Sequence, residues 1–329
     1  MRLLYAIQGT GNGHVSRARE IIPHLLSYGA IDVLISGTHS EIQVGLPVLY
    51  QLHGMGFQFG KSGGISISHS IKSLRPVQFL KDIRSLPIQQ YDMVLNDFEP
   101  VSAYAAKKRG VPIHALSHQA AFLSKLSPRP GKPNMFAEWL FRNYAPCGSY
   151  TAYHFQKYDQ NIHTPVIRAE VRALQKQNTL DHITVYLPAY ESKRLIPHFT
   201  NRKEVQWHLF SKHDKLEHRI ENVWIRPLNN WDYLHSMSSA IGLLTGGGFE
   251  APAEALFLGK KLLVVPMQNQ YEQQCNAAAL AQLGVTVIPV IKDDFASALA
   301  YWLKFTNPIQ LDYPDETAAI LSNILAEFK

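Results

Sequence analysis

The residues whose types and spacing could do chemistry are densest between positions 241 and 278. An apolar run there ends in a glycine turn, and Pro252 follows where a helix would begin. Glycines let the backbone turn sharply and let a ligand approach closely. The first turn of a helix has free N–H groups and a dipole that favours an anion, and it tolerates proline. The turn therefore predicts a phosphate site formed by Thr245, Gly246, Gly247 and Gly248.

Polar side chains follow this turn in two groups. Glu250 and Glu254 are four residues apart and therefore share one face of the predicted helix. The next strand, 261–266, is apolar on both faces, as a buried parallel strand should be. A phosphate site at one strand end and hydroxyl-binding groups at the next describe a site for a sugar nucleotide. The hydroxyl-binding groups are Gln268, Asn269, Gln270, Glu272, Gln273 and Asn276.

A second candidate site lies near the amino terminus. A strand at 2–8 leads into a loop with Gly9, Gly11 and Gly13, and then into a helix that begins near His14. This is the opening of a Rossmann-like unit, but no acidic residue ends the following strand, so NAD binding is disfavoured. The N-terminus of a helix favours the neutral, proton-accepting form of a histidine. His14 is therefore a candidate base, and a structural loop histidine is the alternative.

Further polar residues follow two predicted strands of the first half. Open α/β sheets bind ligands at the carboxyl ends of their strands. We therefore expect Asp97, Glu99, Ser117 and His118 to face the same cleft as His14.

The alternation of strands and helices predicts two α/β units. The first spans 1–162, a polar linker spans 163–178, and the second spans 179–312. A last helix is expected within 313–329, and it could cross back to the first unit.

The composition excludes several classes of protein. The chain has 329 residues, 46% of them hydrophobic, and no apolar run long enough to cross a bilayer, so we expect neither a membrane-spanning helix nor a signal peptide. Cys147 and Cys275 have no motif spacing and favour a reducing compartment, so we expect a cytoplasmic protein. A net charge of +6 suits acidic small molecules or an anionic membrane face. No nucleic-acid-binding motif accompanies that charge, and nucleic acid is not expected as a partner.

Two stretches interrupt the regular alternation. Residues 50–90 are rich in glycine and basic residues and indicate either an acceptor pocket or a surface loop. Residues 123–147 mix basic and aromatic side chains. They indicate either an amphipathic surface that docks on a membrane or a helix that packs its aromatic rings into the core, and we favour the core helix.

The 241–278 segment resembles the donor-binding segment of GT-B glycosyltransferases. The likeness is strongest to UDP-sugar enzymes and to the bacterial lipid-linked N-acetylglucosaminyl transferase. Lys260 replaces a proline of that family, and Gly246 stands where plant-type members have a histidine. The positions that carry the resemblance are Gly248, Glu254, Gly259, Pro266, Glu272, Gln273, Asn276 and Ala277.

The resemblance implies a GT-B fold, in which two Rossmann-like, doubly wound domains face each other across a cleft. It also implies an inverting transfer of sugar from a nucleotide sugar, for which UDP-sugar is the expected donor, to an acceptor hydroxyl. No Asp-x-Asp motif is present to hold a metal, so we expect neither a metal nor another cofactor. Glu250 and Glu254 lack the spacing of eight that the retaining branch shows.

The resemblance also assigns roles to individual residues. Glu254 should bind the ribose hydroxyls, and Glu272 with Gln273 should bind the donor sugar. Arg226 should neighbour the nucleotide base, while Gly11 and Gly13 belong to the glycine loop of the first domain. His14 is the expected general base, and Asp97 is expected to orient it.

Three other functions stay open on the sequence. A sugar-nucleotide 2-epimerase shares the fold and needs no acceptor. A non-catalytic protein could use the fold only to bind a sugar nucleotide, and an NAD oxidoreductase belongs to a different class altogether. The sequence identifies neither the sugar nor the acceptor, which could be lipid-linked or a glycan.

Overall fold

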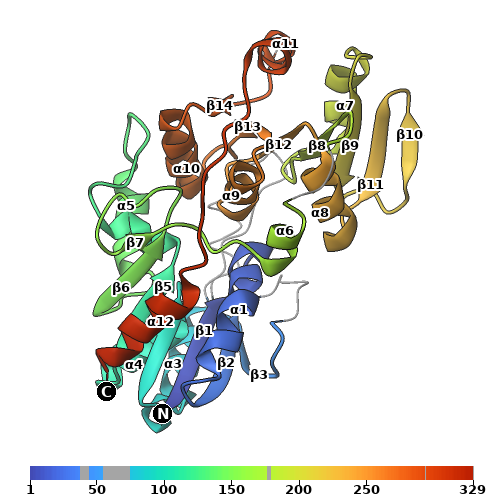
Figure 1. Cartoon of the computed structure of the whole chain (residues 1–329). Coiled ribbons are helices and arrows are strands. Elements are labelled where there is room, and N and C mark those ends of the chain that lie inside the picture. The colour runs from blue at the N-terminus through green and yellow to red at the C-terminus, as the bar shows by residue number, and fades with distance from the viewer. Residues whose placement is uncertain (38–43, 55–74, 176–178, 293, 329) are drawn as a thin grey trace.

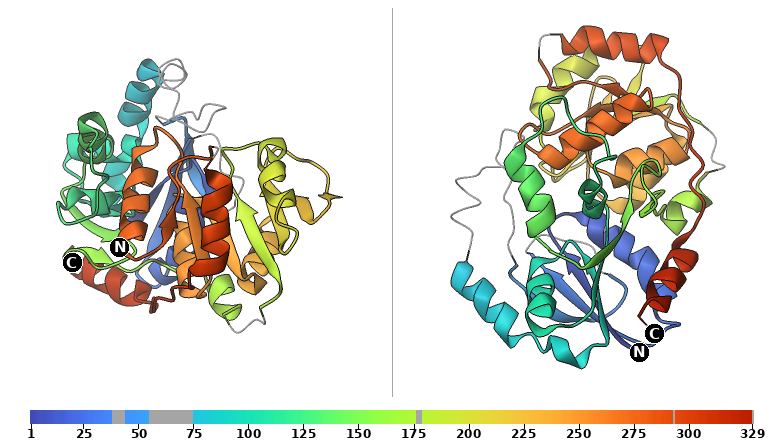
Figure 2. Two further views of the ribbon diagram at one scale, coloured as in Figure 1. Left: turned by 90° about the horizontal axis from the view of Figure 1, so that it is seen from above. Right: turned by 90° about the vertical axis from the view of Figure 1, so that its left-hand side faces the viewer.

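A computed structural model describes residues 1–37, 44–54, 75–175, 179–292 and 294–328. Two seven-stranded sheets form the centres of two domains, which appear as separate lobes in Figure 2. Parallel strands covered on both faces should be continuously apolar. β1 (Arg2–Gln8) illustrates this, because every residue after Arg2 in that strand is buried.

The first sheet is parallel throughout, in the order β3-β2-β1-β4-β5-β6-β7. The polar loops that follow β1 and β4 lie side by side because these two strands pair directly. The elements of this domain are α1 (Asn12–Leu25), β2 (Ala30–Ser36), β3 (Val48–Leu52), α3 (Pro76–Ser85), β4 (Met93–Asp97), α4 (Pro100–Arg109), β5 (Ile113–Ser117), α5 (Met135–Asn143), β6 (Ser149–Tyr153) and β7 (Ile162–His163).

The second sheet has the order β10-β11-β9-β8-β12-β13-β14, and only β10 runs antiparallel to its neighbour. Its elements, after α6 (Ala169–Ala173) in the connecting segment, are β8 (His182–Tyr186), α7 (Ser192–Thr200), β9 (Gln206–Ser211), β10 (His218–Ile220), β11 (Val223–Pro227), α8 (Asn230–Ser239), β12 (Gly242–Gly246), α9 (Glu250–Phe257), β13 (Lys261–Val265), α10 (Tyr271–Gln282), β14 (Thr286–Val287) and α11 (Phe295–Phe305).

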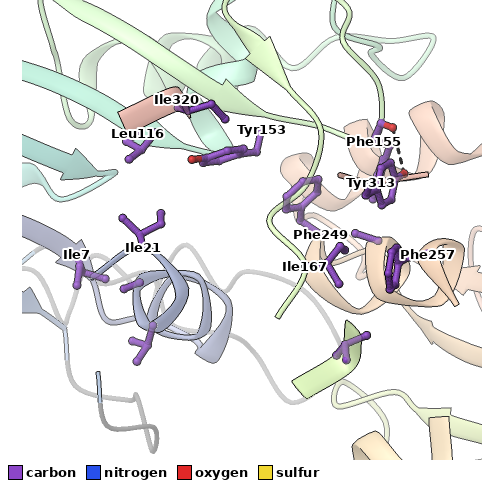
Figure 3. Packing of buried hydrophobic residues seen from close by; sticks show 14 of the residues in the cluster. Ile7, Ile21, Leu116, Tyr153, Phe155, Ile167, Phe249, Phe257, Tyr313 and Ile320 are labelled. Atoms are coloured by element: carbon purple, nitrogen blue, oxygen red, sulfur yellow. Dashed lines mark hydrogen bonds between the residues drawn. The ribbon is translucent and has the colours of Figure 1, made fainter. Parts of the chain in front are cut away.

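The last helix, α12 (Thr317–Ala326), lies against the first domain and packs on α1 (Figure 1). The segment before it runs back from the second domain, and the Tyr313 hydroxyl donates a hydrogen bond to the Phe155 carbonyl over 3.1 Å. One buried apolar cluster includes side chains from both domains, among them Phe155 and Phe249 (Figure 3). The two domains therefore share part of their core beside the cleft.

One expectation from the sequence is wrong in this structure. Within 123–147, α5 contains no buried residue, although we favoured a helix with its aromatic rings in the core. Phe136 and Trp139 are 64% and 56% exposed. The irregular stretch 50–90 lies partly outside the described residues, at 55–74.

Candidate active site

The strand ends of the two domains enclose two adjacent cavities. The larger, of about 510 Å³, is lined by the glycine loop of the first domain and by residues of α9 and α10 in the second. The smaller, of about 160 Å³, lies between the first domain and the start of α10. The residues that line both cavities are Thr10, His14, Gln119, Gln270 and Glu272.

His14 lies in the first turn of α1, between the two cavities. Its Nδ1 is 2.8 Å from Oδ1 of Asp97, at the end of β4, and its Nε2 is 3.4 Å from the amide nitrogen of Gln119. A carboxylate accepts only, so Nδ1 donates to Asp97 when the ring is neutral. The lone pair of the neutral ring is then on Nε2, on the side that faces the cavities. This is the arrangement that a general base needs.

Arg17 is one of two arginines of this site that the sequence did not predict; the other is Arg168. Its guanidinium binds both oxygens of Asp97 over 2.8 Å and one oxygen of Glu250 over 2.7 Å. Asp97 is fully buried, and the positive charges of Arg17 and of protonated His14 oppose that burial, so the pKa of Asp97 is lowered. The spacing of three between His14 and Arg17, which places both on one helix face, could have revealed it.

The two glutamates of α9 both pair with arginines outside the second sheet. Glu254 is 2% exposed, and Arg168 of the connecting segment donates to its two oxygens over 2.5 and 2.8 Å. Glu250 contacts Arg17 through one oxygen. Burial raises the pKa of Glu250 to about 7, although Arg17 and His14 oppose the shift. No local sequence signal marked Arg168.

The amide side chains of α10 support the glycine loop. Gln273 Oε1 accepts hydrogen bonds from the backbone N–H groups of Gly247 and Met267, over 3.1 and 2.9 Å. Asn276 donates to the carbonyl of Gly247, and its oxygen lies 2.8 Å from Nε2 of His118 in the first domain. Gln273 therefore holds the loop in shape as well as lining the larger cavity.

Several expected residues lie elsewhere. Glu99, a candidate for the cleft, is fully buried and caps α4 by accepting from Val101 and Ser102, so that expectation is wrong. Arg226 pairs with Asp232 and stacks over the Trp224 ring, and it is not among the residues that line the larger cavity.

Only part of the predicted phosphate turn lines the larger cavity. Gly248 lines the larger cavity, as do Gly11 and Gly13 of the first domain. Thr245, Gly246 and Gly247 lie behind it, and the Thr245 hydroxyl donates to the Tyr186 carbonyl. Only the last of the three glycines is thus placed to meet a ligand.

The smaller cavity has mostly apolar walls. They include Phe98, Leu140, Phe141, Tyr144 and Tyr271, and the rings of Phe98 and Tyr144 lie 4.8 Å apart. Phe98 follows Asp97 directly and has a φ of 56°, which side chains larger than glycine rarely adopt. Such strain persists only where the surroundings enforce it, and it is common at functional sites.

Comparison with solved structures identifies the fold. MurG of Acinetobacter baumannii matches 99% of this chain and 100% of its own, with 14% identity and a TM-score of 0.59. The glycosyltransferase SsfS6 of Streptomyces sp. SF2575, complexed with thymidine diphosphate, matches 100% and 95%, with 12% identity and a TM-score of 0.61. Phytolacca americana UGT2, complexed with UDP-2-fluoro-glucose and pterostilbene, matches 99% of each chain, with 12% identity and a TM-score of 0.61. The predicted GT-B fold is confirmed.

The sequence comparisons agree with the fold. The model of glycosyl transferase family 1 matches residues 1–303, and the chain belongs to that family. A curated protein described as an uncharacterized glycosyltransferase, from Methanosarcina acetivorans, is 30% identical over 129 residues. That match spans 36% of this chain and about a third, 32%, of the length of the relative. The resemblance to GT-B glycosyltransferases is thereby confirmed.

Proposed function

We propose that the protein transfers a sugar from a nucleoside diphosphate sugar to an acceptor hydroxyl, with inversion and without a metal. The observation that carries this proposal is the place of His14, which lines both cavities while Asp97 fixes its far nitrogen. A donor in the larger cavity and an acceptor in the smaller one would meet at Nε2. His14 would take the acceptor proton as the hydroxyl attacks the anomeric carbon.

The larger cavity suits the donor. It combines the N-termini of α1 and α9, which can stabilise the diphosphate that leaves, with the carboxylate of Glu254 for the ribose hydroxyls. Glu272 lines both cavities, so its carboxylate is well placed to bind hydroxyls of the transferred sugar. Structures similar to this chain contain TDP or UDP, which favours a uridine or thymidine donor.

The smaller cavity favours an apolar acceptor that carries a hydroxyl group. Its volume of about 160 Å³ is close to that of an apolar cavity that accommodates benzene, about 150 Å³, so its size suits a single ring. Rings from Phe141 and Tyr271 line it, and His14 lies at its inner end beside the larger cavity. Such an acceptor would be recognised by aromatic contact and by the one hydroxyl that reacts.

We also propose that the outer face of α5 rests on an anionic membrane. Its inner face lines the smaller cavity, while Met135, Phe136 and Trp139 are 78%, 64% and 56% exposed. The exposed cations Lys132 and Arg142 flank this face, as in helices that lie in the membrane interface. Among the described residues, no helix is both long and apolar enough to cross the bilayer. This contact would place the protein beside a bilayer in which apolar acceptors dissolve.

A panel of UDP, TDP and GDP sugars tests the donor. We expect UDP or TDP sugars to raise the melting temperature, and then to react with a small phenol or cyclic alcohol. Conversion of UDP-N-acetylglucosamine to its 2-epimer without acceptor would instead identify an epimerase. Binding of nicotinamide dinucleotides in place of sugar nucleotides would contradict the proposal.

Sedimentation with vesicles tests the membrane contact. Wild type should bind vesicles that contain phosphatidylglycerol and release them at high salt, and a Phe136→Ser, Trp139→Ser variant should bind weakly. Equal binding of the two proteins would contradict this role of α5.

A further inference from the structure

The N-termini of α1 and α9 converge on the side chain of Glu250. Among the described residues, neither N-cap residue, Gly11 of α1 or Phe249 of α9, caps its helix with a side-chain hydrogen bond, so backbone N–H groups of both first turns are available to another partner. Glu250 is the first residue of α9, and it also lies against Gly13 in the first turn of α1. A Cβ atom added to Gly13 would meet Cγ and Oε1 of Glu250 at 3.4 and 3.5 Å. The carboxylate therefore lies between two positive helix ends.

Arg17 adds a formal positive charge at the same place. Its guanidinium donates to Oε1 of Glu250 over 2.7 Å, and only 3% of the Arg17 side chain is exposed, against 23% for Glu250. Both residues line the larger cavity. A guanidinium and two helix N-termini are the groups that bind phosphate in proteins. A carboxylate of the protein itself thus occupies an anion-binding position.

We propose that Glu250 is an internal competitor for the donor diphosphate, which must displace its carboxylate from Arg17 in order to bind. The inference rests on the proposed function, because it requires a nucleoside diphosphate in the larger cavity. It makes Glu250 a residue that opposes donor binding, unlike its neighbour Glu254. The ion pair also joins α1 to α9 across the cleft.

The competition should depend on pH. The charged or titratable groups that face Glu250 are Arg17 and His14 of α1, Asp97 at the end of β4, and Glu254 on α9. With the pKa of Glu250 raised to about 7, its carboxylate takes up a proton as the pH falls through neutrality. The neutral acid holds Arg17 less tightly and no longer repels a phosphate. Nucleotide binding should therefore strengthen as the pH falls through about 7.

Calorimetric titration with UDP and with TDP tests the proposal directly. At pH 8, Glu250→Gln should bind the nucleotide about tenfold more tightly than wild type, because a like charge next to the phosphate is removed. Glu170→Gln is the matched control. Glu170 pairs with Arg19, also on α1, at 3.6 Å, but both side chains are more than 40% exposed. The nucleotide affinity of Glu170→Gln should match that of wild type. If Glu250→Gln binds the nucleotide no more tightly than wild type does, the proposal is overturned.

The same titration between pH 6 and 8.5 gives a second readout. As the pH falls, the nucleotide affinity of wild type should rise more than that of Glu250→Gln. The phosphate of the nucleotide titrates in both experiments, so its contribution cancels when the two proteins are compared. Parallel pH curves would overturn the proposal. Thermal unfolding of each variant establishes that it is folded. If neither UDP nor TDP binds to any of these proteins, both the proposed function and this inference fail. If the nucleotides bind but Glu250→Gln shows no higher affinity than wild type, only this inference is overturned.

Discussion

The two helix N-termini that face each other across the cleft carry opposite chemistry. α1 supplies a base and a cation, His14 and Arg17, whereas α9 supplies two acids, Glu250 and Glu254. Each acid pairs with an arginine from outside the second domain: Glu250 pairs with Arg17, and Glu254 pairs with Arg168 of the connecting segment. Glu254 is held through both oxygens, while Glu250 is held through one and is more exposed. The difference is consistent with the roles that we propose, a fixed ribose-binding carboxylate at Glu254 and a displaceable carboxylate at Glu250.

Replacing the base on α1 should have the largest effect. Because positioned acid–base groups contribute about 10²–10⁴-fold, His14→Ala should lower turnover by about that factor. Donor affinity, for which we propose other groups, namely the two helix N-termini, Arg17 and Glu254, should stay close to that of wild type. His24→Ala, on the last turn of the same helix, is the control and should retain full turnover. Steady-state kinetics and calorimetry on the three proteins separate the two effects. A large loss of donor affinity in His14→Ala would assign this residue to the donor site instead.

The pH dependence of stability should reflect the burial of Glu250. Burial raises the pKa of Glu250 from 4.5 to about 7, so the folded protein retains a proton that the unfolded chain releases. This contribution to stability is fully present below about pH 4.5 and is lost as the pH rises to about 7. The shift corresponds to about 3 kcal/mol.

Glu250→Gln should remove this part of the pH dependence. We expect the variant to gain unfolding free energy over wild type between pH 5 and 8, as measured by urea denaturation at each pH. Glu170→Gln again serves as the control, since its side chain is 43% exposed. If the curves of wild type and Glu250→Gln run parallel, burial does not destabilise the Glu250 carboxylate.

Replacing the second acid should weaken donor binding. Glu254→Ala should lose about 1.5–3 kcal/mol of nucleotide affinity, the range for hydrogen bonds to a charged group. The expected sign is opposite to that for Glu250→Gln, and calorimetry with UDP or TDP measures both. Because Arg168 would lose its carboxylate partner and keep, among the described residues, only its hydrogen bond to Asn230, the melting temperature of Glu254→Ala must be compared first. Unchanged affinity in a folded variant would remove Glu254 from the ribose site.

The sequence predicted the sheets and strand ends better than the contacts between them. His14 and Asp97 could be placed at one sheet edge because apolar strands precede both. Their separation of 2.8 Å could not be predicted, because it depends on a pairing between segments 83 residues apart. Arg168 was missed for a similar reason, since the connecting segment has no periodic pattern. The exposure of the α5 rings was not predicted, because a stripe of aromatic residues gives the same sequence pattern whether it faces a core or a membrane.

The configuration of the product tests the central claim most directly. A base at His14 that activates the acceptor for direct displacement inverts the anomeric carbon, so an α-linked donor must give a β-linked product. Once the panel has identified a donor and an acceptor, the coupling between the first two sugar protons in the NMR spectrum of the product gives its configuration. The account predicts only the β-linked product from an α-linked UDP or TDP sugar. An α-linked product would contradict direct displacement and the role of His14 as its base.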